Sequence, residues 1–195
     1  MAILKPWQGA GDPTLRWRRL SWAVLIIYRA LRPVIGEKRA LGTIQSVLSR
    51  QFRRHAHAYL EDRFGIRQDA PAGAFAQIAE NYQPRGQRLF GSGFVYVQAV
   101  QTPERSDTHI RRCLFNDFFR AHGAPELTRV FCALDSIWVD ELHKPRYRVH
   151  FERPTTLAAG DDACRFQFSR VNGPDPKASR SAAGQDGSLD NPVRA

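Results

Sequence analysis

The spacing of hydrophobic residues has two different periods along this chain. In the first half, Leu41, Ile44 and Leu48 recur at three- and four-residue steps, which places them on one face of an α-helix. Later, residues 147–151 and 164–168 alternate between apolar and polar types, which is the period of a β-strand. This order predicts an α+β fold, in which N-terminal helices are followed by an antiparallel sheet with two helices packed on it.

Proline and glycine residues mark the expected ends of the helices in the first half. Pro33 with Gly36 ends the first helix, and Pro84 with Gly86 ends the third. The predicted helices cover residues 15–31, 37 to about 60, and 71–81.

The second half is predicted to contain both strands and helices. Residues 94–100 are rich in β-branched and aromatic types and predict a strand, which a loop through Asp107 follows. Asn116 is expected to cap a short helix, and Pro125 to begin a longer helix that ends at Leu142. The residues expected in the core are Phe94, Val97, Phe131, Leu134, Trp138, Phe151, Phe166 and Phe168.

The positive charge of the protein is concentrated near its N-terminus. The 195 residues include 29 Lys and Arg against 19 Asp and Glu, a formal net charge of +10. Residues 1–54 hold 11 basic and 2 acidic side chains, whereas residues 55–195 hold 18 and 17. Because the larger part is nearly neutral, we expect no nucleic-acid groove in the core fold and no nucleic-acid partner.

Composition and charge divide the chain into three predicted segments. Residues 1–35 form a basic arm and an amphipathic helix, residues 36–172 form the folded domain, and residues 173–195 form a disordered tail. The helix carries tryptophans and arginines together, so residues 15–35 have two interpretations. They pack on their own domain with a solvated basic face, or they contact an anionic membrane surface or an acidic protein.

Cysteine number and hydropathy indicate the compartment. Three cysteines, an odd number, do not make a disulfide framework, so a reducing cytoplasm is expected. The longest uncharged apolar run, Leu20 to Tyr28, has nine residues. A bilayer-spanning helix needs about 20. We therefore expect a cytoplasmic protein, peripheral to the membrane if its first helix docks there.

The three cysteines fall on three different predicted elements. Cys113 precedes a helix start and follows two arginines, which favours a thiolate with a lowered pKa. Cys132 shares a helix face with Asp135, three residues on, so a thiol and a carboxylate could line one side of a pocket. Cys164 is in phase with Phe166 and fits a small buried residue. We predict that at least two of the sulfurs border one pocket.

Five short segments resemble one known family. The resemblance is to the L-2-amino-thiazoline-4-carboxylic acid hydrolase family, and it extends more weakly back to the helix that begins near Gly36. The N-terminal basic helix and the C-terminal tail lie outside it. The matching segments are Cys113–Phe115, Gly123–Leu127, Phe131–Asp135, Phe151–Leu157 and Gly160–Phe166.

The resemblance implies a small-molecule substrate and a hydrolytic reaction. A carboxylate-bearing thiazoline ring would be opened to an N-carbamoyl cysteine. Attack on its amidine-like carbon needs a thiolate or an activated water, followed by protonation of the leaving atom. Cys113 or Cys132 would supply the thiolate, Asp135 would move protons, and Arg153 would bind the substrate carboxylate. The other substrate-binding candidates are Asn116, Thr156 and Asp161.

A second hypothesis uses the same cysteines without catalysis. Cys113, Cys132 and Cys164 together could hold a divalent metal or an iron–sulfur cluster, although their spacing matches no local ligand loop. The final Gly-Asp-x-x-Cys-x-Phe segment is also similar to that of 4-vinyl reductase-type domains, which bind small hydrophobic ligands. On this hypothesis the protein is an accessory module, and its basic helix is a docking arm.

Overall fold

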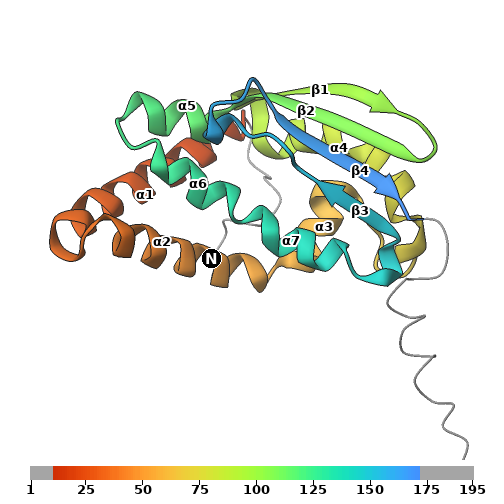
Figure 1. Ribbon diagram of the computed structural model, residues 1–195, viewed down its shortest axis with the longest axis horizontal. Helices are drawn as coiled ribbons and strands as arrows, with labels where there is room; N and C mark the ends of the chain where they lie inside the picture. The colour runs from red at the N-terminus through yellow and green to blue at the C-terminus, as the bar shows by residue number, and fades with distance from the viewer. Residues whose placement is uncertain (1–10, 172–195) are drawn as a thin grey trace, which may run out of the picture.

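The computed structural model describes residues 11–171 of the chain. The tail at 173–195 that was predicted to be disordered lies outside the described residues. In the described part, helices come first, and a four-stranded antiparallel sheet with further helices between its strands follows (Figure 1). The predicted α+β fold is therefore confirmed.

Four α-helices form the first half of the described chain. The first two are joined at Gly36, whose positive φ of 81° is accessible to a residue without a β-carbon. Two short 3-10 turns flank the fourth helix, η2 (Pro71–Gly73) before it and η3 (Gly91–Gly93) after it. The four helices are α1 (Thr14–Ile35), α2 (Glu37–Arg53), α3 (Ala56–Phe64) and α4 (Ala74–Phe90).

The helix predicted over residues 37–60 is two helices. The chain leaves helical geometry at His55, with φ −123°, and re-enters it as α3. After this break, α3 packs into the core, where the side chains of Leu60 and Phe64 are completely buried. Local periodicity does not show the break, since both helices keep the same three- and four-residue spacing.

Two prolines do not end helices where expected. Pro33 lies inside α1, which continues to Ile35, and Pro84 lies inside α4, which continues to Phe90. An interior proline removes one backbone hydrogen bond and costs about 3 kcal/mol. Packing of α4 against the sheet outweighs this cost, because its inner face is buried. The buried side chains of α4 are Ala74, Phe75, Ile78 and Tyr82, together with Gly86.

The sheet has the strand order β1-β2-β4-β3, and each neighbouring pair is antiparallel. The loop predicted through Asp107 is wrong, because Asp107 lies within the second strand. Its buried carboxylate is paired with Arg105 at 2.7 Å, which allows a charged residue in that place. The strands are β1 (Phe94–Gln101), β2 (Arg105–Cys113), β3 (Val149–Glu152) and β4 (Cys164–Arg170).

Three shorter helices connect the two strand pairs, namely α5 (Leu114–Ala121), α6 (Glu126–Cys132) and α7 (Asp135–Leu142). The single helix predicted from Pro125 to Leu142 is therefore divided in two after Cys132. Asn116 does not cap α5 but lies in its first turn, and Cys113 occupies the capping position. The short break after Cys132 lets α7 turn toward the sheet, where it packs on β3.

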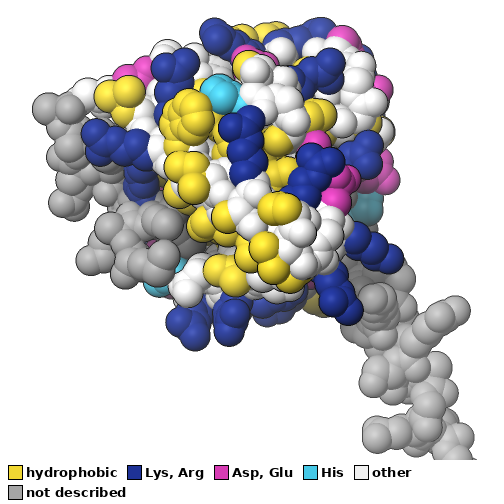
Figure 2. All heavy atoms as spheres, turned by 90° about the vertical axis from the view of Figure 1, so that its left-hand side faces the viewer, with side chains coloured by type: hydrophobic (Ala, Val, Ile, Leu, Met, Phe, Trp, Pro, Cys, Tyr) yellow, Lys and Arg dark blue, Asp and Glu magenta, His cyan; other side chains and the backbone are white. Residues whose placement is uncertain are grey.

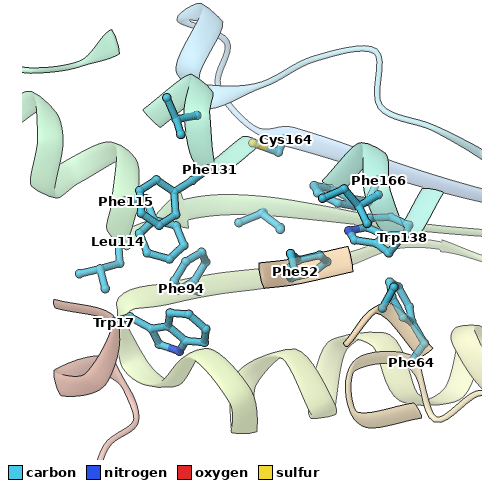
Figure 3. Close-up of a cluster of buried hydrophobic side chains, with 14 of the residues drawn as sticks. Trp17, Phe52, Phe64, Phe94, Leu114, Phe115, Phe131, Trp138, Cys164 and Phe166 are labelled. Carbon is cyan, nitrogen blue, oxygen red and sulfur yellow. The ribbon is translucent and has the colours of Figure 1, made fainter. Parts of the chain in front are cut away.

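The core lies between the sheet and the helices that cover one of its faces (Figure 1). Aromatic rings dominate it, and Phe115 stacks on Phe131 with ring centroids 4.3 Å apart (Figure 3). Two predicted core residues differ. Val97 is 42% exposed, because Phe94 and Tyr96 occupy the inward positions of β1. Leu134 is only partly buried. The other six predicted core residues are buried: Phe94, Phe131, Trp138, Phe151, Phe166 and Phe168.

The first helix is part of this core. Its inner face buries Trp17, Leu25 and Tyr28, and the Trp17 indole donates a hydrogen bond to the Leu89 carbonyl at 2.8 Å. The Tyr28 hydroxyl donates to Glu126 of α6. This confirms the interpretation that the helix packs on its own domain. Among the described residues, no helix is long and apolar enough to cross a membrane.

Candidate functional site

The three cysteines converge on one cavity of about 90 Å³ between the sheet and the helices. Cys113 ends β2, Cys132 ends α6 and Cys164 begins β4, so strand pairing and helix packing bring together residues distant in sequence. Figure 3 shows Cys164 beside the aromatic cluster that forms much of the wall. Asp135 and Arg153 line the same cavity, as the predicted shared pocket required.

Asp135 is held by two donors at the cavity wall. Arg153 Nη1 donates to its Oδ2, and the Trp138 indole donates to its Oδ1 at 2.8 Å. Arg153 Nη2 also donates to the Cys132 carbonyl at 3.3 Å. The side chains of Asp135 and Arg153 keep 25% and 21% of their surface exposed, and both line the cavity. Burial raises the pKa of Asp135, and the charge of Arg153 opposes that rise.

Removal from water raises the pKa of all three cysteine thiols. Burial raises the pKa of Cys132 to about 12, and the nearby negative charge of Asp135 raises it further. Burial likewise raises the pKa of Cys113, although the backbone N–H groups of Asn116 and Phe115 lower it. The expected thiolate at Cys113 is therefore wrong, because removal from water outweighs the helix N-terminus.

Cys164 has the structural surroundings expected of a small buried residue. It is 7% exposed, and its sulfur accepts a hydrogen bond from the Leu157 N–H at 3.3 Å. Burial raises the pKa of its thiol as well. All three cysteines are free of disulfides.

The three further substrate-binding candidates do not line this cavity. Thr156 caps the short turn η5 (Leu157–Ala159) by accepting from the Ala159 N–H at 3.2 Å. Asp161 accepts from the Thr156 N–H at 2.8 Å, so these two residues hold the turn that precedes β4. Asn116 lies in the first turn of α5, as described above.

One cavity residue was missed from the sequence. Arg63 of α3 is 2% exposed and lines the cavity together with the aromatic rings of Tyr59, Tyr82 and Tyr96. A sequence signal existed, because Arg63 lies three residues after Leu60 and shares its buried helix face. An arginine on a helix face that is otherwise apolar indicates either a buried interaction or a ligand site.

A second, mostly apolar cavity of about 160 Å³ lies next to the first. It extends between α1 and α2, where Trp17, Leu20 and Leu48 line it. Asp135 borders both cavities, so its exposed surface faces enclosed space. The smaller cavity is the candidate site, because all three cysteines line it. The residues that line both cavities are Tyr59, Phe90, Phe115, Phe131 and Asp135.

The arrangement gives no support to a metal or iron–sulfur site. Within residues 11–171, no three His, Cys, Asp or Glu side chains form a group that could hold a metal ion. The cavity is instead an enclosed pocket with thiols, one anchored carboxylate and two guanidinium groups.

The fold and cavity define an α+β protein with a cysteine-lined pocket between its sheet and its helices. The sequence model of the L-2-amino-thiazoline-4-carboxylic acid hydrolase family matches residues 18–168, and the chain belongs to this family. The match begins inside α1, earlier than the expected start near Gly36, in agreement with the packing of α1 into the core. None of the curated proteins matches the chain.

Proposed function

We propose that this protein hydrolyses a small, carboxylate-bearing thiazoline or related cyclic amidine ring in the cysteine-lined cavity. The observation that carries the proposal is the position of Asp135, which Arg153 and Trp138 hold beside Cys132. A fixed carboxylate next to a thiol is an arrangement that can move a proton during attack on an amidine carbon. Family membership supports the same class of reaction.

Cys132 is the better placed nucleophile of the two candidates. The charge of Asp135 acts directly on its thiol, whereas no carboxylate is among the causes that shift the pKa of Cys113. A thiol whose pKa is about 12 is protonated at neutral pH, so attack requires a base. Asp135 is the proposed base; burial raises the pKa of its carboxyl, and the charge of Arg153 opposes that rise.

The reaction balances with one water molecule. The Cys132 sulfur adds to the amidine carbon of the ring while its proton passes through Asp135 to the ring nitrogen. The bond from this carbon to the ring sulfur then breaks, and the ring sulfur takes a proton from the exocyclic amino group. Water then adds its oxygen to the same carbon, and the bond from this carbon to the Cys132 sulfur breaks. One proton of the water goes to the Cys132 sulfur and the other to the exocyclic nitrogen. The product is an N-carbamoyl cysteine.

Product formation from the aminothiazoline carboxylate, measured by mass spectrometry, tests this proposal. We expect Cys132→Ala to lose detectable hydrolysis, and Asp135→Asn to slow it by about 100-fold or more. Cys164→Ala is the matched control, which should retain activity at a stability cost of about 1 kcal/mol. Loss in Cys113→Ala with retention in Cys132→Ala would reassign the attack to Cys113. Absence of product from the wild-type protein would refute the proposed reaction.

A further inference from the structure

Arg63 is a buried cation without a carboxylate partner. It is 2% exposed, and among the described residues no carboxylate forms an ion pair with it. Tyr96 and Asp135 act on its charge through space. Its Nη1 donates to the Tyr82 backbone carbonyl, and its guanidinium also hydrogen-bonds the Tyr59 hydroxyl. A guanidinium carries five N–H donors and keeps its charge, so these two contacts leave donors available.

The surroundings of Arg63 form a shaped cradle. Its guanidinium carbon lies 3.7 Å from the Tyr82 ring centroid and 5.3 Å from that of Tyr96. On the helix beside it, a β-carbon at Gly86 would lie 2.8 Å from both terminal nitrogens. The aromatic rings and Gly86 therefore hold the guanidinium plane in one position. A long arginine side chain on the surface is not fixed in this way.

The other cation of the cavity is already neutralised. Among the described residues, Arg63 and Arg153 are the cationic side chains that line this space, and Arg153 is paired with Asp135. Removing a cation from water is costly unless an anion and hydrogen bonds compensate it. Contacts with aromatic rings compensate only part of that cost. Among the described residues, Arg63 is therefore the cation of this cavity that has no salt bridge, although the charge of Asp135 also acts on it.

We propose that Arg63, and not Arg153, binds the carboxylate of the ligand that occupies this cavity. The ligand class is a small, planar or five-membered ring that bears one carboxylate. This inference rests on the proposed function for the identity of the ring, but the anion site itself does not require hydrolysis. With the carboxylate at Arg63, the rest of the ring lies within the same enclosed cavity as Cys132 and Asp135.

Binding of a ring that cannot be hydrolysed tests the anion site. The probe is L-thiazolidine-4-carboxylate, which lacks the amidine carbon, and its neutral carboxamide is the comparison ligand. Isothermal titration of the wild-type full chain should show about tenfold or stronger preference for the carboxylate. Arg63→Gln should remove that preference. Arg67→Gln, an exposed arginine paired with Asp69 just after α3, is the matched control and should keep it.

A second variant of Arg63 separates the loss of its charge from a failure to fold. If Arg63→Gln does not fold, Arg63→Met is the second variant: it keeps an unbranched apolar stem among the rings without the charge, and it should also lose the preference. Equal binding of the two probes by the wild-type protein, or no binding of either at millimolar concentration, would overturn the assignment. A preference that persists in a folded Arg63 variant would do the same. Preferential binding without ring hydrolysis would contradict the proposed reaction alone.

Discussion

At the scale of single residues, the packing of the Arg63 guanidinium requires a glycine at position 86. Gly86 is buried on α4, and a β-carbon there would come within 2.8 Å of the Arg63 guanidinium. Heavy atoms that close must move apart, and Arg63 is held by rings on its other sides. The sequence alone does not indicate this contact, because a glycine inside a helix ordinarily only lowers the stability of the helix.

Gly86→Ala is therefore expected to destabilise the wild-type protein. Alanine in a helix normally stabilises by about 1 kcal/mol relative to glycine. Displacement of the packed guanidinium should reverse the sign and cost about 1–3 kcal/mol. In an Arg63→Ala background the clash is gone, so the same substitution should be neutral or stabilising. Urea unfolding of the four proteins measures this, and equal effects in both backgrounds would contradict the packing argument.

At the scale of elements, the start of α1 is tied to η3 by one carboxylate. Asp12 accepts hydrogen bonds from the N–H and hydroxyl of Thr14 at 2.9 and 2.6 Å, and from the Ser92 N–H at 3.2 Å. Hydrogen bonds from the side chains of Ser92 and Thr14 lower the pKa of Asp12 well below its usual range. The ionised carboxylate therefore links two elements far apart in sequence.

This link makes a contribution to stability that depends on pH. Because the folded-state pKa is below the unfolded value of about 3.9, the contribution is present above pH 4 and is lost as the pH falls toward the folded-state pKa. Asp12→Asn should cost about 1 kcal/mol at neutral pH. The difference in unfolding free energy should shrink between about pH 4 and pH 2. A difference that stays constant over this range would show that the charge of Asp12 has no role.

The helices and strands were predicted to different extents. Most helices and both C-terminal strands follow from periodicity, because neighbouring residues alone create an apolar face. The breaks at His55 and after Cys132 do not, since each depends on where the next helix must pack. The strand β2 was missed because buried polar residues interrupt its apolar pattern, and Ser106 and Thr108 find a hydrogen-bond partner in Gln98 of β1 only when the sheet is formed.

At the scale of the whole molecule, the outer face of α1 carries several exposed hydrophobic side chains among the described residues. The outer face of α1 exposes Leu15, Trp22, Ile26, Ile27 and Val34. Arg18 and Arg19 are also exposed there and form no ion pair with the described residues. Figure 2 shows hydrophobic side chains gathered on the face at the α1–α2 end, with basic side chains around them. Apolar groups beside unpaired arginines are complementary to an anionic lipid surface.

We expect the full-length protein to bind anionic membranes through this face. It should pellet with vesicles containing phosphatidylserine more than with phosphatidylcholine vesicles, and less so as salt screens the arginines. Ile26→Ser combined with Ile27→Ser should weaken binding. Val95→Ser combined with Val97→Ser, which changes two exposed residues of β1, is the matched control. Absence of vesicle binding by the wild-type protein would contradict this prediction and leave an acidic protein as the partner of this face. Self-association of the wild-type protein that the α1 variant loses would indicate a second copy as the partner.

The sequence by itself determined the fold class, the family and the cysteine and acid–base candidates of the site. Periodicity is local, and the motif Phe131–Asp135 already places a thiol and a carboxylate three residues apart. Only the tertiary structure decided the protonation of the thiols and the partner of Arg153. It also decided that Arg63 lines the cavity without a salt bridge to any described residue. These properties depend on burial and on contacts between distant elements, because a pKa and an ion pair are set by everything within a few ångströms, whatever its position in the chain.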